Sequence, residues 1–161
     1  MTLNDEIAEV WRTGGSLDRL LAQLVVETAS RASGCWRLEN DHLVLVGFGW
    51  ADDMPDSIST GFQDATRRVP LSQTGLGIVK AATTSQPAIG RRDPRSTGLD
   101  GSATWIEKFG ANTSLAVPIC RTSGDVTTGV IAVSTAEFVE EGDLLWNRLH
   151  ELARELASAD E

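Results

Sequence analysis

The sequence lacks the features that mark membrane, secreted or nucleic-acid-binding proteins. No stretch approaches the ~18 consecutive apolar residues that a membrane-spanning helix needs. The first six residues are acidic rather than basic, so they do not form a secretory signal. Only 14 lysines and arginines face 23 acidic residues, a net charge of -9, which argues against nucleic acid or a membrane surface as a partner. We therefore expect a cytoplasmic location.

Cysteine and histidine are scarce, with two of each and no Cys-x-x-Cys motif. Zinc sites combine several such ligands at short spacing, so we expect no metal site. Without a secretory context, Cys35 and Cys120 are expected to be reduced thiols. They form a candidate redox pair, although buried structural thiols are frequent. His42 and His150 are isolated in the sequence, as surface histidines usually are, and the residues leave any cofactor unknown.

The last third of the chain is the most informative part. An apolar run at 113–120 is followed by a polar turn, and a second apolar run covers 129–134. These runs predict the two strands of a hairpin. Leucines at helical spacing then predict an amphipathic helix at 140–158. Because 161 residues fit a single hydrophobic core, this order of elements favours an α+β domain.

Upstream, the sequence predicts two helices and a first hairpin. The first helix covers 4–12 with Asn4 as its N-cap, and the second covers 16–32. Strands are expected at 35–38 and 42–50. Both faces of the second strand are apolar, so it should be central and covered on both sides.

The middle of the chain is expected to be mainly irregular. Residues 51–66 are polar, with Pro55 as a breaker, and 90–103 are rich in small polar residues, so both should be loops. Short extended pieces are expected at 68–71 and 87–89, and short helices at 75–82 and 104–109.

The second hairpin has one bulky and one small face, because side chains alternate across a strand. The bulky face carries Leu115, Val117, Ile119, Ile131 and Val133. The small face carries Ser114, Ala116, Pro118, Cys120, Ala132 and Ser134. We expect the bulky face to pack on the first and last helices. The small face leaves volume that either the 72–109 segment or a ligand fills.

Several segments, taken in order, resemble the GAF domain, a small-molecule sensor and dimerisation module. The resemblance is carried by Val69-Pro70-Leu71, Gly75-Leu76-Gly77-Ile78-Val79, Gln86-Pro87-Ala88, Ser114 to Ile119, Gly129 to Ser134, and Phe138 with its following acids. It covers 16–158 as a single domain and leaves 1–15 as a helical N-terminal extension. It implies a GAF-like, PAS-related α+β fold, with an antiparallel sheet of five or six strands and helices on both sides.

The resemblance also implies a ligand cavity between the small face and the 72–109 segment. Arginines in the loop there are suited to fork to a phosphate or carboxylate, and a tryptophan to stack on a planar ligand. A solvated loop and a core tryptophan are the alternatives. The candidate ligand-binding residues are Phe48, Ile89, Arg91, Arg92, Asp93, Trp105, Ser114 and Ala116.

The terminal helix carries a heptad-like leucine stripe, which suits either of two partners. It packs on the sheet, or it pairs with the same helix of a second subunit, as GAF domains often do. We expect a homodimer. The candidate interface residues are Val10, Trp11, Leu145, Leu149, Leu152 and Leu156.

The expected function is that of a non-enzymatic sensory or regulatory domain, which binds an unidentified small molecule and signals through a dimeric helical interface or a partner protein. The chain lacks the Cys-His pair of bilin-binding GAF domains and the motif of those that bind cyclic nucleotides. A ligand-free interaction or dimerisation module is the first alternative. A cysteine-dependent free methionine sulfoxide reductase is less favoured, because the segments that carry its cysteines contain none here.

Overall fold

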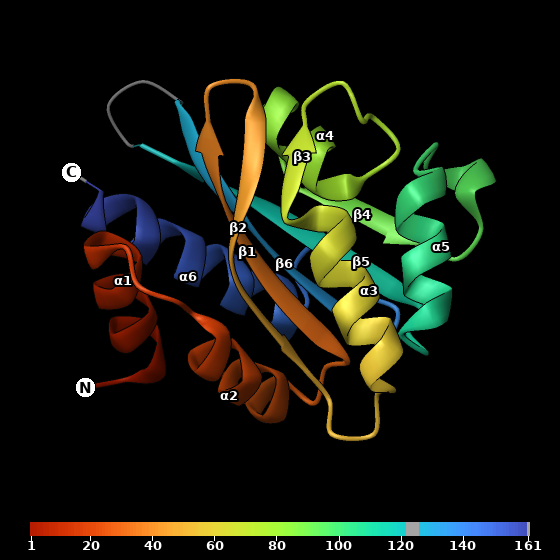
Figure 1. Ribbon diagram of the computed structural model, residues 1–161, viewed down its shortest axis with the longest axis horizontal. Helices are drawn as coiled ribbons and strands as arrows, with labels where there is room; N and C mark the ends of the chain where they lie inside the picture. The colour runs from red at the N-terminus through yellow and green to blue at the C-terminus, as the bar shows by residue number, and fades with distance from the viewer. Residues whose placement is uncertain (122–125, 161) are drawn as a thin grey trace.

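The computed structural model describes residues 1–121 and 126–160. Its centre is one six-stranded antiparallel sheet with the order β3-β2-β1-β6-β5-β4 (Figure 1). The strands are β1 (Ala32–Glu39), β2 (His42–Trp50), β3 (Arg68–Pro70), β4 (Ala88–Arg91), β5 (Thr113–Cys120) and β6 (Thr127–Thr135). The predicted α+β architecture and the six-stranded version of the sheet are confirmed.

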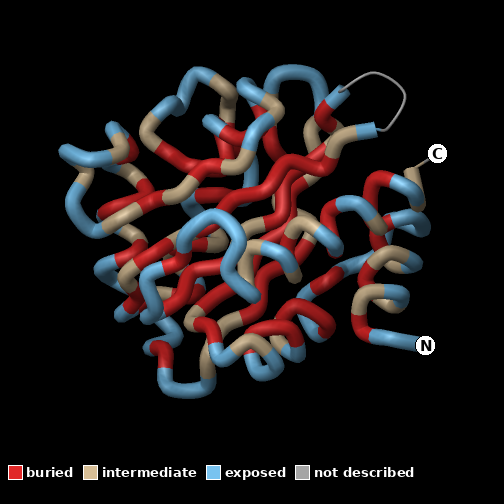
Figure 2. Tube along the Cα trace, turned by 180° about the vertical axis from the view of Figure 1, so that it is seen from behind, coloured by how far each residue is buried: buried red, intermediate tan, exposed pale blue. Residues whose placement is uncertain are grey.

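Helices cover both faces of the sheet. One face packs against α1 (Leu3–Thr13), α2 (Asp18–Thr28) and α6 (Leu144–Ala159). The other packs against α3 (Asp56–Thr66), α4 (Gly77–Thr84) and α5 (Asp100–Lys108), with a short 3-10 turn at Pro94–Ser96. Figure 2 shows buried residues along the strands and exposed residues on the loops and outer helix faces. The sheet thus separates two apolar cores.

The first two helices begin and end for local reasons. In α1, the Thr2 side chain accepts a hydrogen bond from the Asp5 amide at 3.1 Å, and the Asp5 carboxylate accepts one from the Thr2 amide. This capping box makes Thr2 the N-cap, so the prediction of Asn4 was wrong by two residues. Gly14 ends the helix with φ 87°. The predicted end of α2 at residue 32 was also wrong, because Ala29 adopts φ 52° and releases the chain into β1.

The predicted loop at 51–66 was wrong, because most of it forms α3. Pro55 lies just before the first turn, where a missing amide hydrogen costs nothing, so it starts the helix instead of breaking one. Ser59, Phe62 and Thr66 form the buried side of this mostly polar helix. Its stability comes from packing of that narrow face rather than from a strong apolar period.

The loop predicted at 90–103 is also partly regular. It contains the end of β4 and the 3-10 turn, and α5 begins at Asp100 rather than at Thr104. The 3-10 turn starts with Asp93, whose carboxylate accepts a hydrogen bond from the Arg95 amide at 3.0 Å.

The bulky face of the β5–β6 hairpin packs on the first and last helices, as predicted. Leu115, Val117 and Ile119 belong to one core with the inner sides of α1, α2 and α6. At the end of this core, the Arg37 guanidinium lies 3.8 Å from the centre of the Trp11 ring and donates to the Trp11 carbonyl at 2.6 Å. Arg37 therefore joins β1 to α1.

The leucine stripe of α6 lies inside the chain. Leu149, Leu152 and Leu156 are fully buried, and Trp11 of α1 is 1% exposed. Leu145 and Val10 are half-buried against the same core. The sequence left two partners open for the stripe, the sheet or a second subunit. In the structure the stripe packs on the sheet, so its buried leucines are not available to a second subunit in this arrangement.

Among the helices of the described residues, none combines the length and the apolar composition that a membrane span requires.

Candidate functional site

A cavity of about 50 Å³ lies between the small face of the sheet and helices α3, α4 and α5. Its floor is the β5–β6 hairpin with Trp36 of β1, and its walls and roof come from the three helices. The lining residues are Trp36, Phe62, Thr66, Leu76, Gly77, Ile78, Ser102, Trp105, Ile106, Phe109, Ser114, Ala116, Ala132 and Ser134. The cavity therefore occupies the position that the small face predicted.

The floor is made of two cross-strand pairs of small side chains. Ser114 is the register partner of Ser134, and Ala116 is the partner of Ala132. Ser114 and Ala132 are only half-buried, although they belong to interior strands of the sheet. Since both residues line the cavity, this exposure shows that solvent-sized space reaches the floor.

The floor carries two serine hydroxyls that are available to a ligand. Among the described residues, neither the Ser114 nor the Ser134 hydroxyl has a hydrogen-bond partner, and neither is sealed from solvent. Gly90 of β4 faces Ser114, and a Cβ there would collide with the Ser114 hydroxyl. Gly90 therefore leaves room for the Ser114 hydroxyl at the floor.

The walls are aromatic. The centre of the Phe62 ring lies 5.0 Å from that of Phe109 and 5.1 Å from that of Trp105, both in edge-to-face geometry. The centre of the Trp36 ring lies 6.1 Å from that of Phe62, also in edge-to-face geometry. Trp105 is the half-buried member of this group, and the Lys108 ammonium lies 4.5 Å from the centre of its ring. These rings offer faces and edges to a flat apolar ligand.

Hydrogen bonds hold the helices around the cavity. The Ser102 hydroxyl of α5 accepts from the Gly77 amide of α4 at 2.8 Å. At the other end of α5, Arg31 donates through Nε to the Phe109 carbonyl at 2.9 Å and pairs with Asp53 at 2.6 Å. This contact holds the pKa of the Asp53 carboxyl below its ordinary value. Arg31 thus ties α5 to the sheet and to the β2–α3 loop.

Among the described residues, those that line the cavity carry neither a charge nor a thiol, and none of their side chains is ionisable. Cys35 lies in the core on the opposite face, where burial raises the pKa of its thiol well above the ordinary value. Cys120 ends β5 and lies 3.6 Å from the Thr127 hydroxyl. In the described ranges, no cluster of three or more His, Cys, Asp or Glu residues could hold a metal ion.

Half of the candidate ligand-binding residues lie at or beside the cavity. Trp105, Ser114 and Ala116 line it. Phe48 lies behind the wall, with its ring centre 5.0 Å from that of Phe62. Ile89 packs against the core on the other side of the sheet, so its placement at the cavity is corrected.

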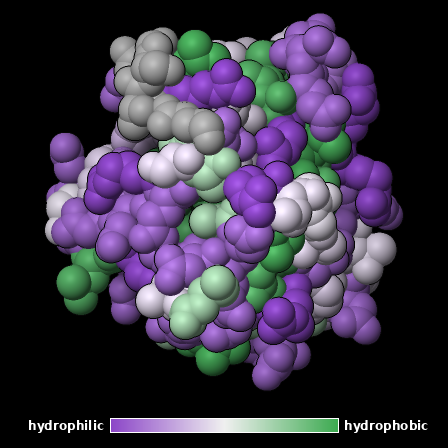
Figure 3. Space-filling view, turned by 90° about the vertical axis from the view of Figure 1, so that its left-hand side faces the viewer, coloured by the Kyte–Doolittle hydropathy of each residue, from purple (hydrophilic) through white to green (hydrophobic). Residues whose placement is uncertain are grey.

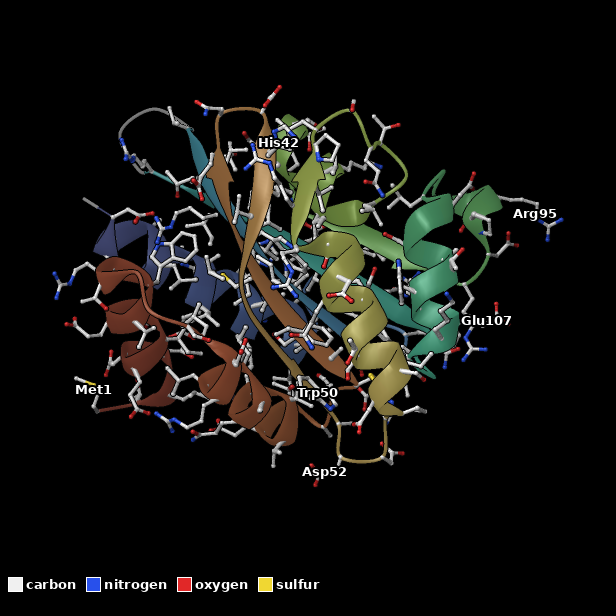
Figure 4. All side chains as sticks on the ribbon, in the orientation of Figure 1. Met1, His42, Trp50, Asp52, Arg95 and Glu107 are labelled. Atoms are coloured by element: carbon white, nitrogen blue, oxygen red, sulfur yellow. The ribbon has the colours of Figure 1, made fainter. Side chains whose placement is uncertain are left out.

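The charged candidates also lie elsewhere. Arg91 donates to the Thr113 hydroxyl at 2.6 Å and to the Val139 carbonyl at 2.8 Å, and Arg92 donates to the Ala111 carbonyl at 2.6 Å. Asp93 pairs with Arg95, which points away from the protein (Figure 4). None of them lines the cavity. The prediction that Arg91, Arg92 and Asp93 line the cavity was therefore wrong, because their hydrogen bonds and ion pair hold them outside it.

Sequence reasoning missed several lining residues. Phe62 and Thr66 were missed because α3 was predicted to be a loop. Ala132 and Ser134 carried a usable signal, because they lie opposite Ala116 and Ser114 on the small face of the hairpin. Ser102 carried none, since its role depends on how α5 meets α4.

No protein-family model matches the sequence, and no curated protein matches it. Solved structures do match over nearly the whole chain. The GAF domain region of a putative membrane protein from Geobacter sulfurreducens PCA has a TM-score of 0.66 and 16% identity, with coverage of 98% of this chain and 94% of that one. A methyl-accepting chemotaxis protein fragment, residues 122 to 287, has a TM-score of 0.65 and 18% identity, with coverage of 98% and 94%.

Enzymes with this fold match as well. The free methionine-R-sulfoxide reductase from Neisseria meningitidis, in complex with its substrate, has a TM-score of 0.61 and 18% identity, with coverage of 98% of this chain and 86% of that one. The chain therefore has the GAF fold that its sequence resembles. Solved structures with this fold include both a chemotaxis protein fragment and reductases, so the fold alone does not determine the function of this chain.

Proposed function

We propose that this chain is a non-enzymatic regulatory domain that binds a small molecule in the cavity above the β5–β6 floor. One observation carries the proposal: two serine hydroxyls that have no hydrogen-bond partner among the described residues face an aromatic-walled cavity from the β5–β6 hairpin. Concave, mostly apolar sites with a few convergent polar groups are where proteins bind small ligands.

The positions of the two cysteines argue against the reductase alternative. Reduction of a sulfoxide by a protein thiol needs a thiolate that reaches the bound substrate. Neither Cys35 nor Cys120 lines the cavity, and Cys35 is held as a neutral thiol by burial. Although reductases share the fold, no cysteine or methionine is among the described residues that line the cavity of this chain.

The size of the cavity favours one second candidate. About 50 Å³ is far below the ~300–1,000 Å³ of typical ligand pockets. A ligand-free interaction or dimerisation module, with a cavity filled by its own aromatic side chains, accounts for this volume. In such a module the hydroxyls of Ser114 and Ser134 would bond only to solvent, whereas a bound ligand would give them a partner inside the cavity.

A signal from the cavity has a short route to the terminal helix. Thr113 neighbours Ser114 in the chain, and its hydroxyl accepts from Arg91. Arg91 also holds the Val139 carbonyl, in the segment that leads into α6. A ligand that binds one arrangement of this link better than another would shift the population of α6 positions.

For a homodimer, we propose that α1 and α6 contribute their outer faces rather than their buried stripe. The side of the molecule where these helices and both termini lie is mainly hydrophilic, with scattered apolar patches (Figure 3). Glu9, Arg12, Glu151 and Arg154 are exposed on these helices. A partner protein that receives the signal would meet the same charged surface.

Native mass spectrometry of the purified protein beside an Ala132→Leu variant tests the proposal. The leucine fills the floor, so we expect a discrete added mass on the wild type that is absent from the variant, and Ala65→Leu on the exposed side of α3 should behave as the wild type does. An added mass retained by Ala132→Leu would contradict the site. If the wild type carries no added mass and no small molecule tested raises its melting temperature, the ligand-free module is favoured. The same spectra report the number of subunits.

A further inference from the structure

We propose that the cavity selects a neutral molecule with one planar ring and one hydrogen-bonding group, and that this molecule enters by displacing the Trp105 indole. This inference rests on the proposed function, because it names the ligand class of the same site. It is carried by the charge, the polar groups, the walls and the volume of the cavity.

The absence of charge in the lining sets the first requirement. No described side chain that lines the cavity is ionisable, so a charged ligand would leave water without meeting a counter-charge. Two cationic side chains contact residues of the walls, and each already has a partner. Arg31 is held by the Phe109 carbonyl and Asp53, and the Lys108 ammonium lies over the Trp105 ring. Phosphates, carboxylates and zwitterionic amino acids are therefore disfavoured.

The floor sets the second requirement. The Ser114 and Ser134 hydroxyls face each other across the β5–β6 pair, and each can donate or accept a hydrogen bond. The other lining hydroxyls are engaged, since Thr66 donates to the Phe62 carbonyl at 2.8 Å and Ser102 accepts from the Gly77 amide. Polar recognition is thus concentrated at one end, which suits a single amide or hydroxyl group on the ligand.

The walls favour a flat ring. The walls that remain when Trp105 moves are Phe62, Phe109 and Trp36. The ring centre of Phe62 lies 5.0 Å from that of Phe109 and 6.1 Å from that of Trp36, both in edge-to-face geometry. Aromatic pairs prefer offset-stacked or edge-to-face contact at about 4.5–7 Å between ring centres, so a ring in the place of the Trp105 indole meets aromatic partners.

The volume requires a gate. An apolar cavity of ~150 Å³ holds benzene, whereas this one has about 50 Å³. A ring fits only if one wall side chain moves. Trp36, Phe62 and Phe109 are at most 9% exposed, whereas Trp105 is half-buried and no hydrogen bond among the described residues holds its indole. Trp105 is the side chain that can swing outward at the lowest cost.

Three probes of nearly equal shape and different charge test the inference: benzamide, benzoate and benzamidine. Titration is followed by tryptophan fluorescence in the wild type and in Trp105→Phe. We expect benzamide to bind saturably, with an emission change that Trp105→Phe loses, and the two ions to bind at least about 10-fold more weakly. Benzoate or benzamidine binding as tightly as benzamide would overturn the neutral class.

Variants separate the hydroxyl pair from the gate. Ser114→Ala/Ser134→Ala should weaken benzamide binding about 2- to 10-fold and leave toluene binding unchanged, because only the amide uses the hydroxyls. Ser72→Ala, on an exposed turn, should change neither. Trp105→Ala should tighten benzamide binding, since the gate is gone, and calorimetric titration measures this because the variant lacks the reporting indole. Weaker binding to Trp105→Ala would show a stacking wall and contradict the gate.

A thermal-shift screen separates failure of this inference from failure of the proposed function. Neutral, anionic and cationic one-ring compounds are compared on the wild type and on Ala132→Leu. Stabilisation of the wild type alone by neutral compounds supports the inference. Stabilisation of the wild type alone by charged compounds overturns the inference and leaves the function in place. If no compound stabilises the wild type more than Ala132→Leu, both the inference and the proposed function are overturned.

Discussion

The two faces of the sheet are built from the same strands but packed in opposite ways. On the face toward α1, α2 and α6, large side chains such as Leu115, Ile119 and Ile131 are at most 1% exposed. On the face toward α3, α4 and α5, serine and alanine replace them and a cavity remains. In β5 and β6 the alternation of residue size along the strand therefore divides the sheet into a closely packed structural face and a face with a cavity, which we propose to be the binding face.

This division shows where change is tolerated. Removing atoms from a closely packed core leaves a void that the surroundings cannot fill, whereas atoms removed beside an existing cavity leave fewer broken contacts. The first face should therefore govern stability and the second should govern ligand binding. The following predictions test this separation.

The largest effect is expected from Leu152→Ala on α6. Leu152 is fully buried, so its truncation should lower the free energy of unfolding by about 2–5 kcal/mol in urea titration. Leu144→Ala, on the same helix at 90% exposure, should change it by less than about 0.5 kcal/mol. Equal losses in the two variants would show that α6 is not part of the core.

A smaller loss is expected from Cys35→Ser on the same face. The serine hydroxyl would be buried among apolar side chains, which costs about 1–3 kcal/mol when it finds no partner. Cys120→Ser, at the half-buried end of β5, should be nearly neutral. A thiol-reactive dye should label Cys120 in the folded protein and Cys35 only after unfolding. Rapid labelling of both would contradict the burial of Cys35.

Trp105→Ala on the binding face should cost about 1–2 kcal/mol, less than a fully buried tryptophan, because the indole is already half-exposed. Calorimetric unfolding of this variant beside Leu152→Ala gives the comparison directly. A loss for Trp105→Ala that exceeds the loss for Leu152→Ala would mean that the binding face carries the stability.

The smallest effect concerns Glu155 on α6. Burial, with the neighbouring carboxylates of Glu151 and Asp5, raises the pKa of Glu155 above its ordinary value of 4.5. Ionisation of Glu155 therefore destabilises the folded state as pH rises from below 4.5 through the raised pKa. Glu155→Gln should match the wild type near pH 4 and exceed it slightly at pH 7, by less than about 0.5 kcal/mol in urea titration. If the difference in the free energy of unfolding between Glu155→Gln and the wild type grows as the pH falls, the raised pKa of Glu155 is contradicted.

The sequence predicted the sheet well where the signal is local. The runs at 113–120 and 129–134 alternate large and small side chains, and that alternation indicated both the strand positions and the side on which the cavity lies. Helix α3 was not predictable in this way. Phe62 is its main buried apolar side chain, and the helix is held by contacts with distant rings such as Trp36 and Phe48.

The sequence predicted the floor of the candidate site, on the β5–β6 hairpin, but not the residues that cover it. Ile89 and Gly90 are consecutive in β4, and one residue of register decides which of them faces the cavity. The arginines looked available because their carbonyl partners, such as those of Ala111 and Val139, are far away in the sequence. The leucine spacing of α6 likewise indicates an apolar stripe without saying whether a sheet or a second helix covers it.

The most direct test of the two-sided account is a titration of isotope-labelled protein with benzamide, followed by amide chemical shifts. We predict the largest shifts at the floor and covering helices, around Gly77, Ser102, Trp105, Ser114 and Ser134, with α1 and the inner side of α6 nearly unchanged. Shifts centred on α1 and α6, or spread evenly over the surface, would contradict the assignment of one face to structure and the other to binding.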